Sequence, residues 1–288
     1  MSQLQDLNIQ WFPGHMTKTR RYIEKNISQV DIVAETVDAR CINASRNPDF
    51  DNLLKNKKRL MIITKCDLAD PDVTSRWINS FKADGRECVT VSLNTGKGVK
   101  DILPAVRTAL SEQIERYAAK GMKKTIRMMI CGIPNSGKST LINSLCGKKV
   151  VVAEDRPGVT RGGQWVTLSS DIQLLDTPGI LWNKFDDNNT GLSLAFTGAI
   201  KDDVLDVETL ALHLINKLVS IYPESLKNRY DVEITDAMEP LEIYEQICKR
   251  RGFIVRGGDF DYERCARVVL DEFRAGKLGR ISLEAPNA

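Results

Sequence analysis

The sequence lacks the features that would direct a protein into a membrane or out of the cell. It has no uninterrupted run of about 18 apolar residues, so no membrane-spanning helix is predicted. Its N-terminus has no apolar core of the kind found in signal peptides. The seven cysteines are scattered and form no C-x-x-C pair, which argues against disulfides and a zinc site. We therefore expect a cytoplasmic protein with reduced, mostly buried thiols and no membrane partner.

An excess of charge of one sign is also missing. The 41 basic and 38 acidic residues nearly cancel, which leaves a net charge of +3, so charge alone does not predict a nucleic-acid partner. The chain contains no internal repeat and no low-complexity segment. Its 288 residues predict about two domains with ample chain for a core.

A phosphate-binding loop is predicted at residues 132–139, which read Gly-Ile-Pro-Asn-Ser-Gly-Lys-Ser. A mostly apolar run of strand length precedes it, and apolar residues at helical spacing follow it. This arrangement points backbone N–H groups and a helix N-terminus at one spot, which favours a phosphate. A chance match within a turn is the alternative, but it would not explain why strand, loop and helix agree. The predicted phosphate-binding residues are Asn135, Ser136, Gly137, Lys138, Ser139 and Thr140, with Gly179 further along the chain.

Two further segments resemble the guanine-reading parts of GTPases. Thr64–Asp67 follows the apolar strand Leu60–Ile63 and resembles the N/T-K-x-D motif, although Thr64 stands where Asn is commoner. The Asp67 carboxylate can accept from two N–H groups of guanine that adenine lacks, a difference worth on the order of 10⁴-fold in a site built for it. Each segment alone could be a solvated turn. Together with the loop at 132–139 they predict a guanine site made of Thr64, Lys65, Cys66, Asp67, Ser92, Leu93 and Asn94.

Two segments after the phosphate-binding loop match the switches of a GTPase. Residues 176–179 read Asp-Thr-Pro-Gly after an apolar strand, which is the D-x-x-G pattern of switch II. Thr160, in a turn-rich stretch, fits the switch I threonine, with a plain loop residue as the alternative. The predicted Mg²⁺ residues are Ser139, Thr160 and Asp176. Loss of the terminal phosphate from Gly179 on hydrolysis would release the switches.

The order of these motifs is permuted, because the base-reading segments precede the phosphate-binding loop. Strands alternate with helices, which predicts a mainly parallel sheet with helices on both faces. The expected fold is therefore an α/β, circularly permuted P-loop GTPase domain with an N-terminal extension at 1–185. Helical periodicity after residue 203 predicts a small all-α domain at 186–288, with helices near 207–218, 240–251 and 262–273. Switch II lies close in sequence to this second domain, so the nucleotide can influence it.

With these motifs the chain resembles the YlqF/RbgA family of bacterial ribosome biogenesis GTPases and their organelle relatives. The resemblance covers nearly the whole chain and implies GTP/GDP and Mg²⁺ as ligands, with the large ribosomal subunit as partner and stimulator of hydrolysis. It also implies that the C-terminal domain contacts ribosomal RNA. The matching segments are 11–16 (Trp-Phe-Pro-Gly-His-Met), 38–40 (Asp-Ala-Arg), 132–135 (Gly-Ile-Pro-Asn) and 197–200 (Thr-Gly-Ala-Ile), besides the permuted order.

The residue that orients the attacking water is not where many GTPases have it. Ile180 follows the D-x-x-G segment and can neither donate nor accept a hydrogen bond through its side chain. The resemblance assigns the catalytic role to His15, whose imidazole could orient water; otherwise His15 packs with Trp11 and Phe12 or contacts RNA. The second histidine, His213, is interpreted as structural.

A bound potassium ion is the second candidate for catalysis. Asn135 matches the asparagine of potassium-activated GTPases, and K⁺ beside the phosphates would supply the charge of an arginine finger. The alternative is that Asn135 only stabilises the turn.

A basic cluster in the C-terminal region is the candidate RNA-binding surface. It could grip RNA phosphates or simply be a solvated helix end, and the resemblance favours RNA. Two other functions stay open: a nucleotide-gated RNA-binding scaffold with negligible hydrolysis, and a P-loop kinase or ATPase. We expect a monomer. The cluster consists of Lys249, Arg250, Arg251 and Arg256, with Lys18, Arg20 and Arg21 as a second basic candidate.

Overall fold

The computed structural model describes residues 7, 9, 14–148, 165–182, 185 and 187–286. These residues form two compact units. The sheet unit contains the described residues from 14 to 182 together with 284–286, and the helical unit contains residues 185–283. Leu7 and Ile9 group with the helical unit rather than with the sheet unit that follows them in sequence. Ile9 explains this grouping, since a Cβ at Gly191 of the helical unit would lie 3.1 Å from the Ile9 Cβ.

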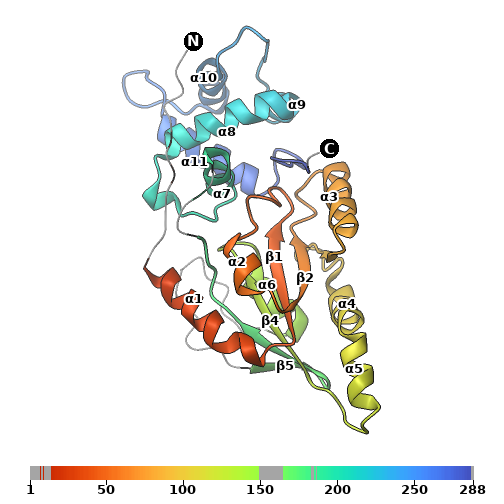
Figure 1. Ribbon diagram of the computed structural model, residues 1–288. Helices are drawn as coiled ribbons and strands as arrows, with labels where there is room; N and C mark the ends of the chain where they lie inside the picture. Colours follow the sequence, from red (N-terminus) through yellow and green to blue (C-terminus); the bar gives the residue numbers. More distant parts are fainter. Residues whose placement is uncertain are drawn as a thin grey trace. The chain divides into compact units, whose positions relative to one another are not determined.

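The sheet unit is built on six strands in the order β3-β2-β1-β4-β6-β5. Figure 1 labels β1, β2, β4 and β5 of this sheet. All neighbouring pairs are parallel except β5–β6, which is antiparallel and was not predicted. The predicted mainly parallel sheet is confirmed. The carboxyl ends of its parallel strands meet at one edge, where the predicted motifs begin. The strands are β1 (Ile32–Asp38), β2 (Lys58–Thr64), β3 (Glu87–Thr90), β4 (Ile126–Gly132), β5 (Trp165–Ser169) and β6 (Ile172–Asp176).

Helices cover both faces of this sheet, as predicted. One apolar cluster joins Ile32 and Ala34 of β1 to α4 and α6, and a second joins Val37 of β1 to α3. This division follows from the two-residue period of a strand. The helices of the sheet unit are α1 (His15–Asn26), α2 (Asp49–Leu53), α3 (Pro71–Ala83), α4 (Ile102–Ala109), α5 (Ser111–Ala118) and α6 (Lys138–Cys146), with 3-10 turns at Ile27–Gln29 and Val99–Asp101.

Local sequence explains where α3 begins, and core packing explains why α4 and α5 are separate helices. The Asp70 side chain accepts hydrogen bonds from the N–H groups of Asp72 and Val73, and Pro71 occupies the first helical position, so α3 begins at Pro71. The sequence from 99 to 119 by itself predicts one long helix, but the structure divides it at Leu110. The backbone there leaves the helical region (φ −113°, ψ 14°), and the Leu110 side chain joins the core.

The helical unit packs around α8, which contacts α7, α9, α10 and α11. Its residues Leu210, Leu214 and Leu218 recur at a spacing of four and are fully buried. The three predicted C-terminal helices are confirmed, while α7 and α9 were not predicted. Within the described part of the chain, every helix is too short or too polar to span a bilayer. The helices are α7 (Asn188–Phe196), α8 (Val207–Ile221), α9 (Pro223–Tyr230), α10 (Pro240–Arg251) and α11 (Tyr262–Arg274), with a 3-10 turn at Asp202–Val204.

Candidate nucleotide-binding site

The loop between β4 and α6 has the tight backbone that a phosphate-binding loop requires. A Cβ at Gly132 would lie 2.3 Å from the Thr36 hydroxyl oxygen and 2.6 Å from the Thr36 carbonyl oxygen, so only glycine fits there. Ser136 Oγ donates to the Ile133 carbonyl (2.8 Å) and shares a hydrogen bond with Thr36 Oγ1 (2.7 Å), which closes the turn. Gly137, at φ 88°, precedes α6 and lets its N-terminal N–H groups face the loop.

Lys138 and Asp176 are buried side chains of opposite charge that influence each other electrostatically beside this loop. Lys138 Nζ donates to the Ile133 carbonyl, and burial lowers the pKa of Lys138 to about 8 against the attraction of Asp176. Burial likewise raises the pKa of Asp176 to about 6, although the charge of Lys138 opposes this shift. Both groups are therefore poised to change their protonation near neutral pH.

The oxygen donors near Lys138 suit a magnesium ion bound together with phosphates. Asp176 Oδ1 is buried and has no hydrogen-bond partner among the described residues. Ser139, in the first turn of α6, adds a hydroxyl oxygen. Mg²⁺ prefers such hard oxygen ligands and takes few from the protein when phosphates supply the others. The described ranges contain no group of three His, Cys, Asp or Glu side chains that could hold a metal.

The segment 177–180 lies directly on the phosphate-binding loop. The Ile180 N–H donates to the Gly132 carbonyl (3.1 Å), and the Thr177 hydroxyl donates to the Ile130 carbonyl (2.7 Å). A Cβ at Gly179 would lie 2.8 Å from both Cα and N of Pro134, so the approach requires glycine. Asn47 Nδ2 donates to the Ile180 carbonyl (3.2 Å), and the Ile180 side chain is buried.

The predicted guanine-reading segments lie beside the same loop. Thr64 Oγ1 is within hydrogen-bond distance of the Ser136 carbonyl (2.8 Å) and the Val37 carbonyl (2.9 Å), so this threonine ties β2 to the loop. Asn94 Nδ2 donates to Asp67 Oδ2 (3.2 Å). The other oxygen, Asp67 Oδ1, is buried without a hydrogen-bond partner among the described residues.

The remaining members of the guanine set are close to these residues. The Cys66 N–H donates to the Val91 carbonyl (3.3 Å), which aligns the two segments. Ser92 is buried and its Oγ accepts from the Thr95 N–H (3.4 Å). Leu93 reaches the phosphate-binding loop, since a Cβ at Gly137 would lie 3.1 Å from Leu93 Cδ1. The structure thus brings 64–67, 92–94 and 132–139 together.

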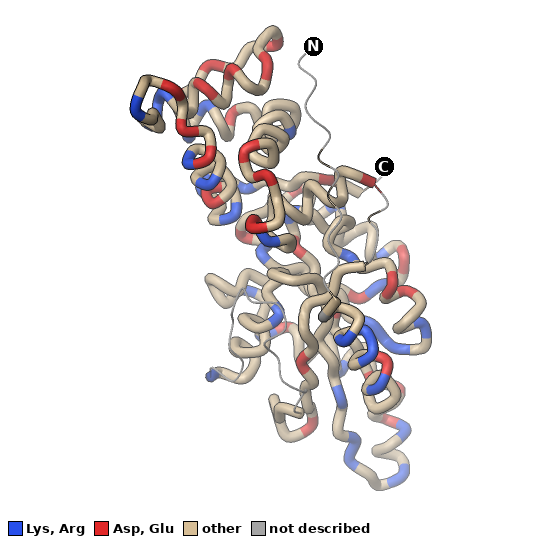
Figure 2. The backbone as a smooth tube through the Cα atoms, turned by 90° about the vertical axis from the view of Figure 1, so that its left-hand side faces the viewer, with Lys and Arg blue, Asp and Glu red and all other residues tan. Residues whose placement is uncertain are grey.

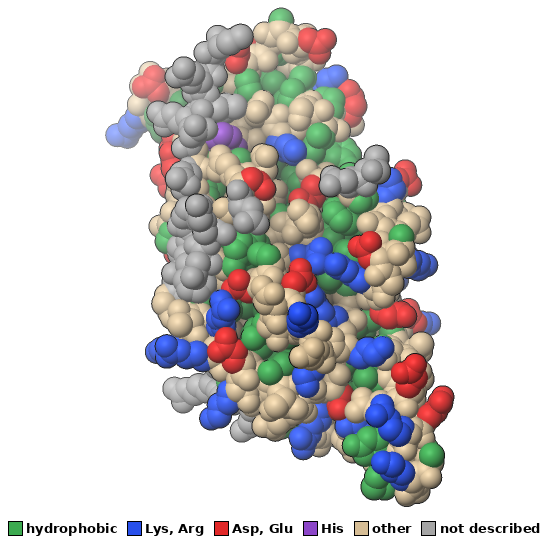
Figure 3. Space-filling model, viewed as in Figure 1, with side chains coloured by type: hydrophobic (Ala, Val, Ile, Leu, Met, Phe, Trp, Pro, Cys, Tyr) green, Lys and Arg blue, Asp and Glu red, His purple; other side chains and the backbone are tan. Residues whose placement is uncertain are grey.

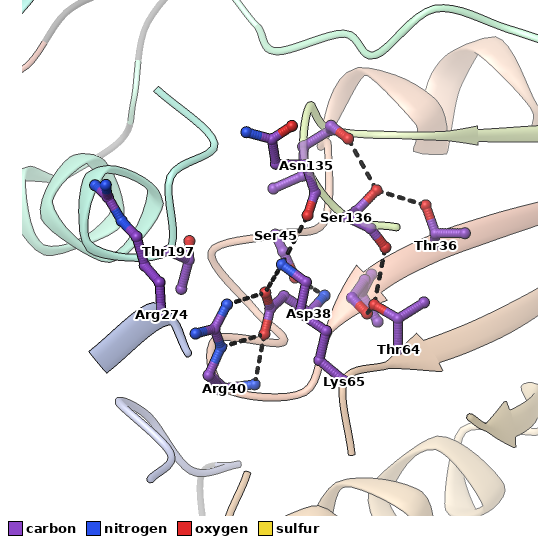
Figure 4. Close-up of polar contacts among 12 residues, drawn as sticks. Thr36, Asp38, Arg40, Ser45, Thr64, Lys65, Asn135, Ser136, Thr197 and Arg274 are labelled. Atoms are coloured by element: carbon purple, nitrogen blue, oxygen red, sulfur yellow. Dashed lines mark hydrogen bonds and ion pairs between the residues drawn. The ribbon is translucent and has the colours of Figure 1, made fainter. Parts of the chain in front are cut away.

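Lys65 connects the guanine-reading segment to the loop through a contact that sequence reasoning missed. Its Nζ donates to the Asn135 carbonyl (2.7 Å) and forms an ion pair with Asp38 Oδ2 (2.9 Å), while the Asn135 side-chain amide points away (Figure 4). Asp38 is also paired with Arg40 (2.8 Å). Burial alone would raise the pKa of Asp38, but the charges of Arg40 and Lys65 hold it well below its usual range. The available signal was an acidic residue at a strand end, two positions before an arginine.

Several predicted residues lie outside this description. Thr160 falls outside the described residues, and so do Trp11, Phe12 and the side chain of His15. Their roles therefore stay predictions. His213 lies on α8 and is half-buried.

The basic cluster of the helical unit is only partly available to a partner. Lys249, Arg250 and Arg256 are exposed. Arg250 pairs with the exposed Asp231 (3.2 Å), a contact that contributes little stability in water. Arg251 is exposed as well, and its guanidinium lies over the Tyr230 ring, 5.2 Å from the ring centroid, so it also contributes to packing within the unit. Figure 2 shows acidic segments interspersed with the basic ones in this unit.

The second basic candidate lies on α1. Arg20 of this helix pairs with Glu24 (3.3 Å) and Asp49 (2.9 Å), and Lys18 is exposed. Figure 3 shows further Lys and Arg side chains around the lower end of the sheet unit, where α5 turns towards β4. Acidic side chains separate these groups, so the basic surface is not continuous in this view.

Comparison with known proteins agrees with a nucleotide-binding site at this edge of the sheet. A family model described as 50S ribosome-binding GTPase matches residues 127–245. The YlqF structure from Thermotoga maritima, described as GNP-bound, has a TM-score of 0.67 at 26% identity and covers 94% of this chain and 99% of its own. A GDP-bound YlqF structure has a TM-score of 0.66 at 26% identity, covering 92% and 98%.

Proteins named ribosome biogenesis GTPase A match over almost their whole length. The one from Thermotoga maritima is 29% identical over 276 residues, which is 96% of this chain and 94% of that protein. The one from Priestia megaterium is 45% identical over 284 residues, or 98% of each chain. Because this relative is 45% identical over almost the whole of both chains, the chain belongs to the ribosome biogenesis GTPase A family.

Proposed function

We propose that this protein binds and hydrolyses GTP and acts as an assembly factor for the large ribosomal subunit. The observation that carries the nucleotide assignment is the unpaired, buried Asp67 Oδ1 beside the phosphate-binding loop. A buried carboxylate oxygen needs a donor, and guanine offers two N–H groups where adenine offers none. The names of the relatives support the role in ribosome assembly.

The residues of the site divide the work on the nucleotide. Lys138 neutralises phosphate charge, and Ser139 and Asp176 would hold Mg²⁺, with Thr160 as a third ligand. The ion supplies charge stabilisation at the transferred phosphoryl group. Gly179 offers its backbone N–H to the terminal phosphate, and the Lys65 stem lies along the base.

Calorimetric titration of the protein with GDP and with ADP in magnesium buffer tests the guanine assignment. We expect GDP to bind at least 100-fold more tightly than ADP, by the loss of buried partners in the wrong complex. In Asp67→Asn, the side-chain amide can donate to a base with a carbonyl at position 2. The affinity for xanthosine diphosphate should therefore rise relative to the affinity for GDP. Tight binding of ADP would instead support a kinase or ATPase.

Two groups are proposed to orient the attacking water or stabilise the transferred phosphate: His15 and a potassium ion at Asn135. The buried Ile180 side chain supports the need for such a group. Turnover of GTP should rise when sodium is exchanged for potassium at fixed ionic strength, and equal rates would exclude the potassium site. His15→Ala should bind GTP but hydrolyse it slowly. If that variant still supports subunit assembly, the nucleotide-gated scaffold is the better description.

The helical unit is the proposed RNA-contacting part, and switch II is its link to the nucleotide. The chain runs from Ile180 to the start of α7 at Asn188 within eight residues, so a displacement of switch II acts on this unit through a short connection. GTP turnover should rise when purified large subunits are added in potassium buffer. The absence of stimulation would count against the large subunit as partner.

A matched pair of variants separates RNA contact from general charge effects. Lys249→Gln/Arg250→Gln removes two exposed charges from the basic cluster, and Lys55→Gln/Lys82→Gln removes two exposed charges from the sheet unit. Only the first pair should weaken binding to large subunits and flatten its salt dependence, because each phosphate contact releases counterions. Equal effects of both pairs would assign the loss to net charge alone.

A further inference from the structure

We propose that Asp38, held in place by Arg40, is a positioning residue for guanine nucleotide binding that acts through Lys65. The proposal rests on the proposed function and adds two residues to its binding machinery. Neither residue needs to touch the nucleotide. Asp38 instead fixes the ammonium group of Lys65, whose aliphatic stem lies along the base in the proposed complex.

The Asp38 carboxylate is fixed by hydrogen bonds to both of its oxygens. Oδ1 accepts from the Arg40 backbone N–H (3.0 Å) and from Arg40 Nε (3.0 Å). Oδ2 accepts from Arg40 Nη2 (2.8 Å) and faces Lys65 Nζ at 2.9 Å. The side chains of Asp38 and Arg40 are only 3% and 2% exposed, so water does not compete for these contacts. Figure 4 shows the carboxylate between the two cationic groups.

The backbone around Asp38 is held equally firmly. The Asp38 N–H donates to Ser45 Oγ (2.9 Å), and the Ser45 hydroxyl donates to the Ile42 carbonyl (3.2 Å). The next N–H, that of Ala39, donates to the Thr64 carbonyl (2.9 Å). This hydrogen bond ties the residue after Asp38 to Thr64, the last residue of β2, and Lys65 follows Thr64 directly in the chain.

Lys65 needs such an anchor because its backbone has an unfavourable conformation that neighbouring contacts must hold in place. Its φ is +56°, in the left-handed region that side-chain-bearing residues seldom adopt. The residue it contacts, Asn135, also has a positive φ of +55°. A lysine side chain has many rotamers in water, and two acceptors, Asp38 Oδ2 and the Asn135 carbonyl, select one of them. The base then meets a stem that is already placed.

A purely structural role is the competing explanation, in which Asp38 and Arg40 only stabilise the loop after β1. The two explanations differ in whether the effect passes through Lys65. A double-mutant cycle measures this, because residues that act through one another show non-additive effects. Replacing both charges together, in Asp38→Asn/Arg40→Gln, avoids leaving either charge buried and unpaired.

The cycle consists of wild type, Asp38→Asn/Arg40→Gln, Lys65→Ala and the triple variant, each titrated calorimetrically with GDP in magnesium buffer. We expect the Kd to rise about 10-fold in the double variant, the loss typical of one charge-assisted contact. The triple variant should lie within about threefold of Lys65→Ala, since the anchor has nothing left to position. Asp171→Asn/Arg107→Gln, which removes an ion pair (2.7 Å) far from Lys65 in the sequence and outside the proposed site, should stay within about twofold of wild type.

Two results would overturn the proposal: a double variant that binds GDP as wild type does, or losses that multiply in the triple variant. If the double variant does not fold by circular dichroism, Arg40→Lys replaces it, because lysine keeps the charge but not the two-pronged contact. Weaker GDP binding by Arg40→Lys only when Lys65 is present would then support the proposal, and unchanged binding would refute it. Failure of wild type itself to bind GDP would refute the proposed function instead.

Discussion

Replacing Gly179 by alanine tests whether switch II must rest on the phosphate-binding loop. The added Cβ would lie 2.8 Å from Cα and N of Pro134 and 3.1 Å from Lys138 Nζ. Carbon atoms pack at about 3.5–4.0 Å, so the shortfall is about 1 Å. The nearest atoms belong to the backbone and cannot rotate away. Switch II must therefore shift by about this distance, which breaks the 3.1 Å hydrogen bond from the Ile180 N–H to the Gly132 carbonyl.

The shift should affect hydrolysis far more than GDP binding. A displacement of about 1 Å in a positioning group lowers a rate by about 100-fold, so kcat for GTP should fall by that factor in single-turnover measurements. The lost hydrogen bond and the strain together should lower the free energy of unfolding by about 2 kcal/mol. GDP lacks the terminal phosphate that the Gly179 N–H would contact. The Kd of GDP should therefore change less than about threefold, because its proposed contacts with residues 64–67 do not involve switch II.

Gly85→Ala is the matched control for this substitution. Gly85 has a positive φ of +69° but no atom within 4 Å of the added Cβ. It should lose about 1 kcal/mol of stability through backbone strain alone and keep its kcat. A Gly179→Ala protein with kcat within threefold of wild type, or an equal loss in Gly85→Ala, would refute the reasoning.

Three further predictions concern the pH profile and the stability of the sheet unit. The value of kcat/KM for GTP should fall below a pH of about 6, where Asp176 becomes protonated, and above about 8, where Lys138 loses its proton; a flat profile from 5 to 9 would contradict these roles. Asp70→Ala removes the N-cap of α3 and should cost about 1 kcal/mol in urea unfolding, with an unchanged midpoint counting against the cap. Leu174→Ala, in the fully buried core, should cost about 2–5 kcal/mol, whereas Val204→Ala, which is 52% exposed, should cost almost nothing.

The sign of the Asp176 effect on stability differs from that on activity. Burial raises its pKa to about 6 in the folded protein, above the ordinary value of 3.8, so the folded state binds the proton more tightly than the unfolded chain. The nucleotide-free protein should therefore gain stability from this group as the pH falls from about 6 to about 4. Thermal unfolding of wild type and Asp176→Asn across this range would separate the contribution.

The parts of the site that could be predicted from the sequence are those that follow directly from strand ends. The segments 64–67, 132–139 and 176–179 each follow an apolar run, and parallel strands deliver their carboxyl ends to one edge. The contact between Asp38 and Lys65 could not be predicted this way, because it depends on the register that places Asp38 opposite Thr64. The same holds for Asn47 and Ile180, which are 133 positions apart.

Some elements depended on packing rather than on local pattern. Apolar spacing alone made 99–119 one helix, yet the core draws Leu110 inwards and divides it. α7 begins at an Asp187 cap, but its short apolar run had no clear helical period. The functions assigned to His15 and Thr160 still rest on the resemblance and on motif spacing.

The strand order has a consequence for how the chain folds as it is made. β1, β2 and β3 lie on one side of β4, and β6 and β5 lie on the other. The half of the sheet made of β1, β2 and β3, which carries the predicted base-reading segments, is therefore one continuous stretch of chain. It is synthesised before β4, and its strands can pair through contacts close in sequence. The β1–β4 pairing bridges a longer separation than the other described strand pairs, from Ile32 to Met128, and the β4–β6 pairing follows with Ile126 opposite Ile172. During its own synthesis the protein therefore completes its base-reading half before it has any means of holding a phosphate.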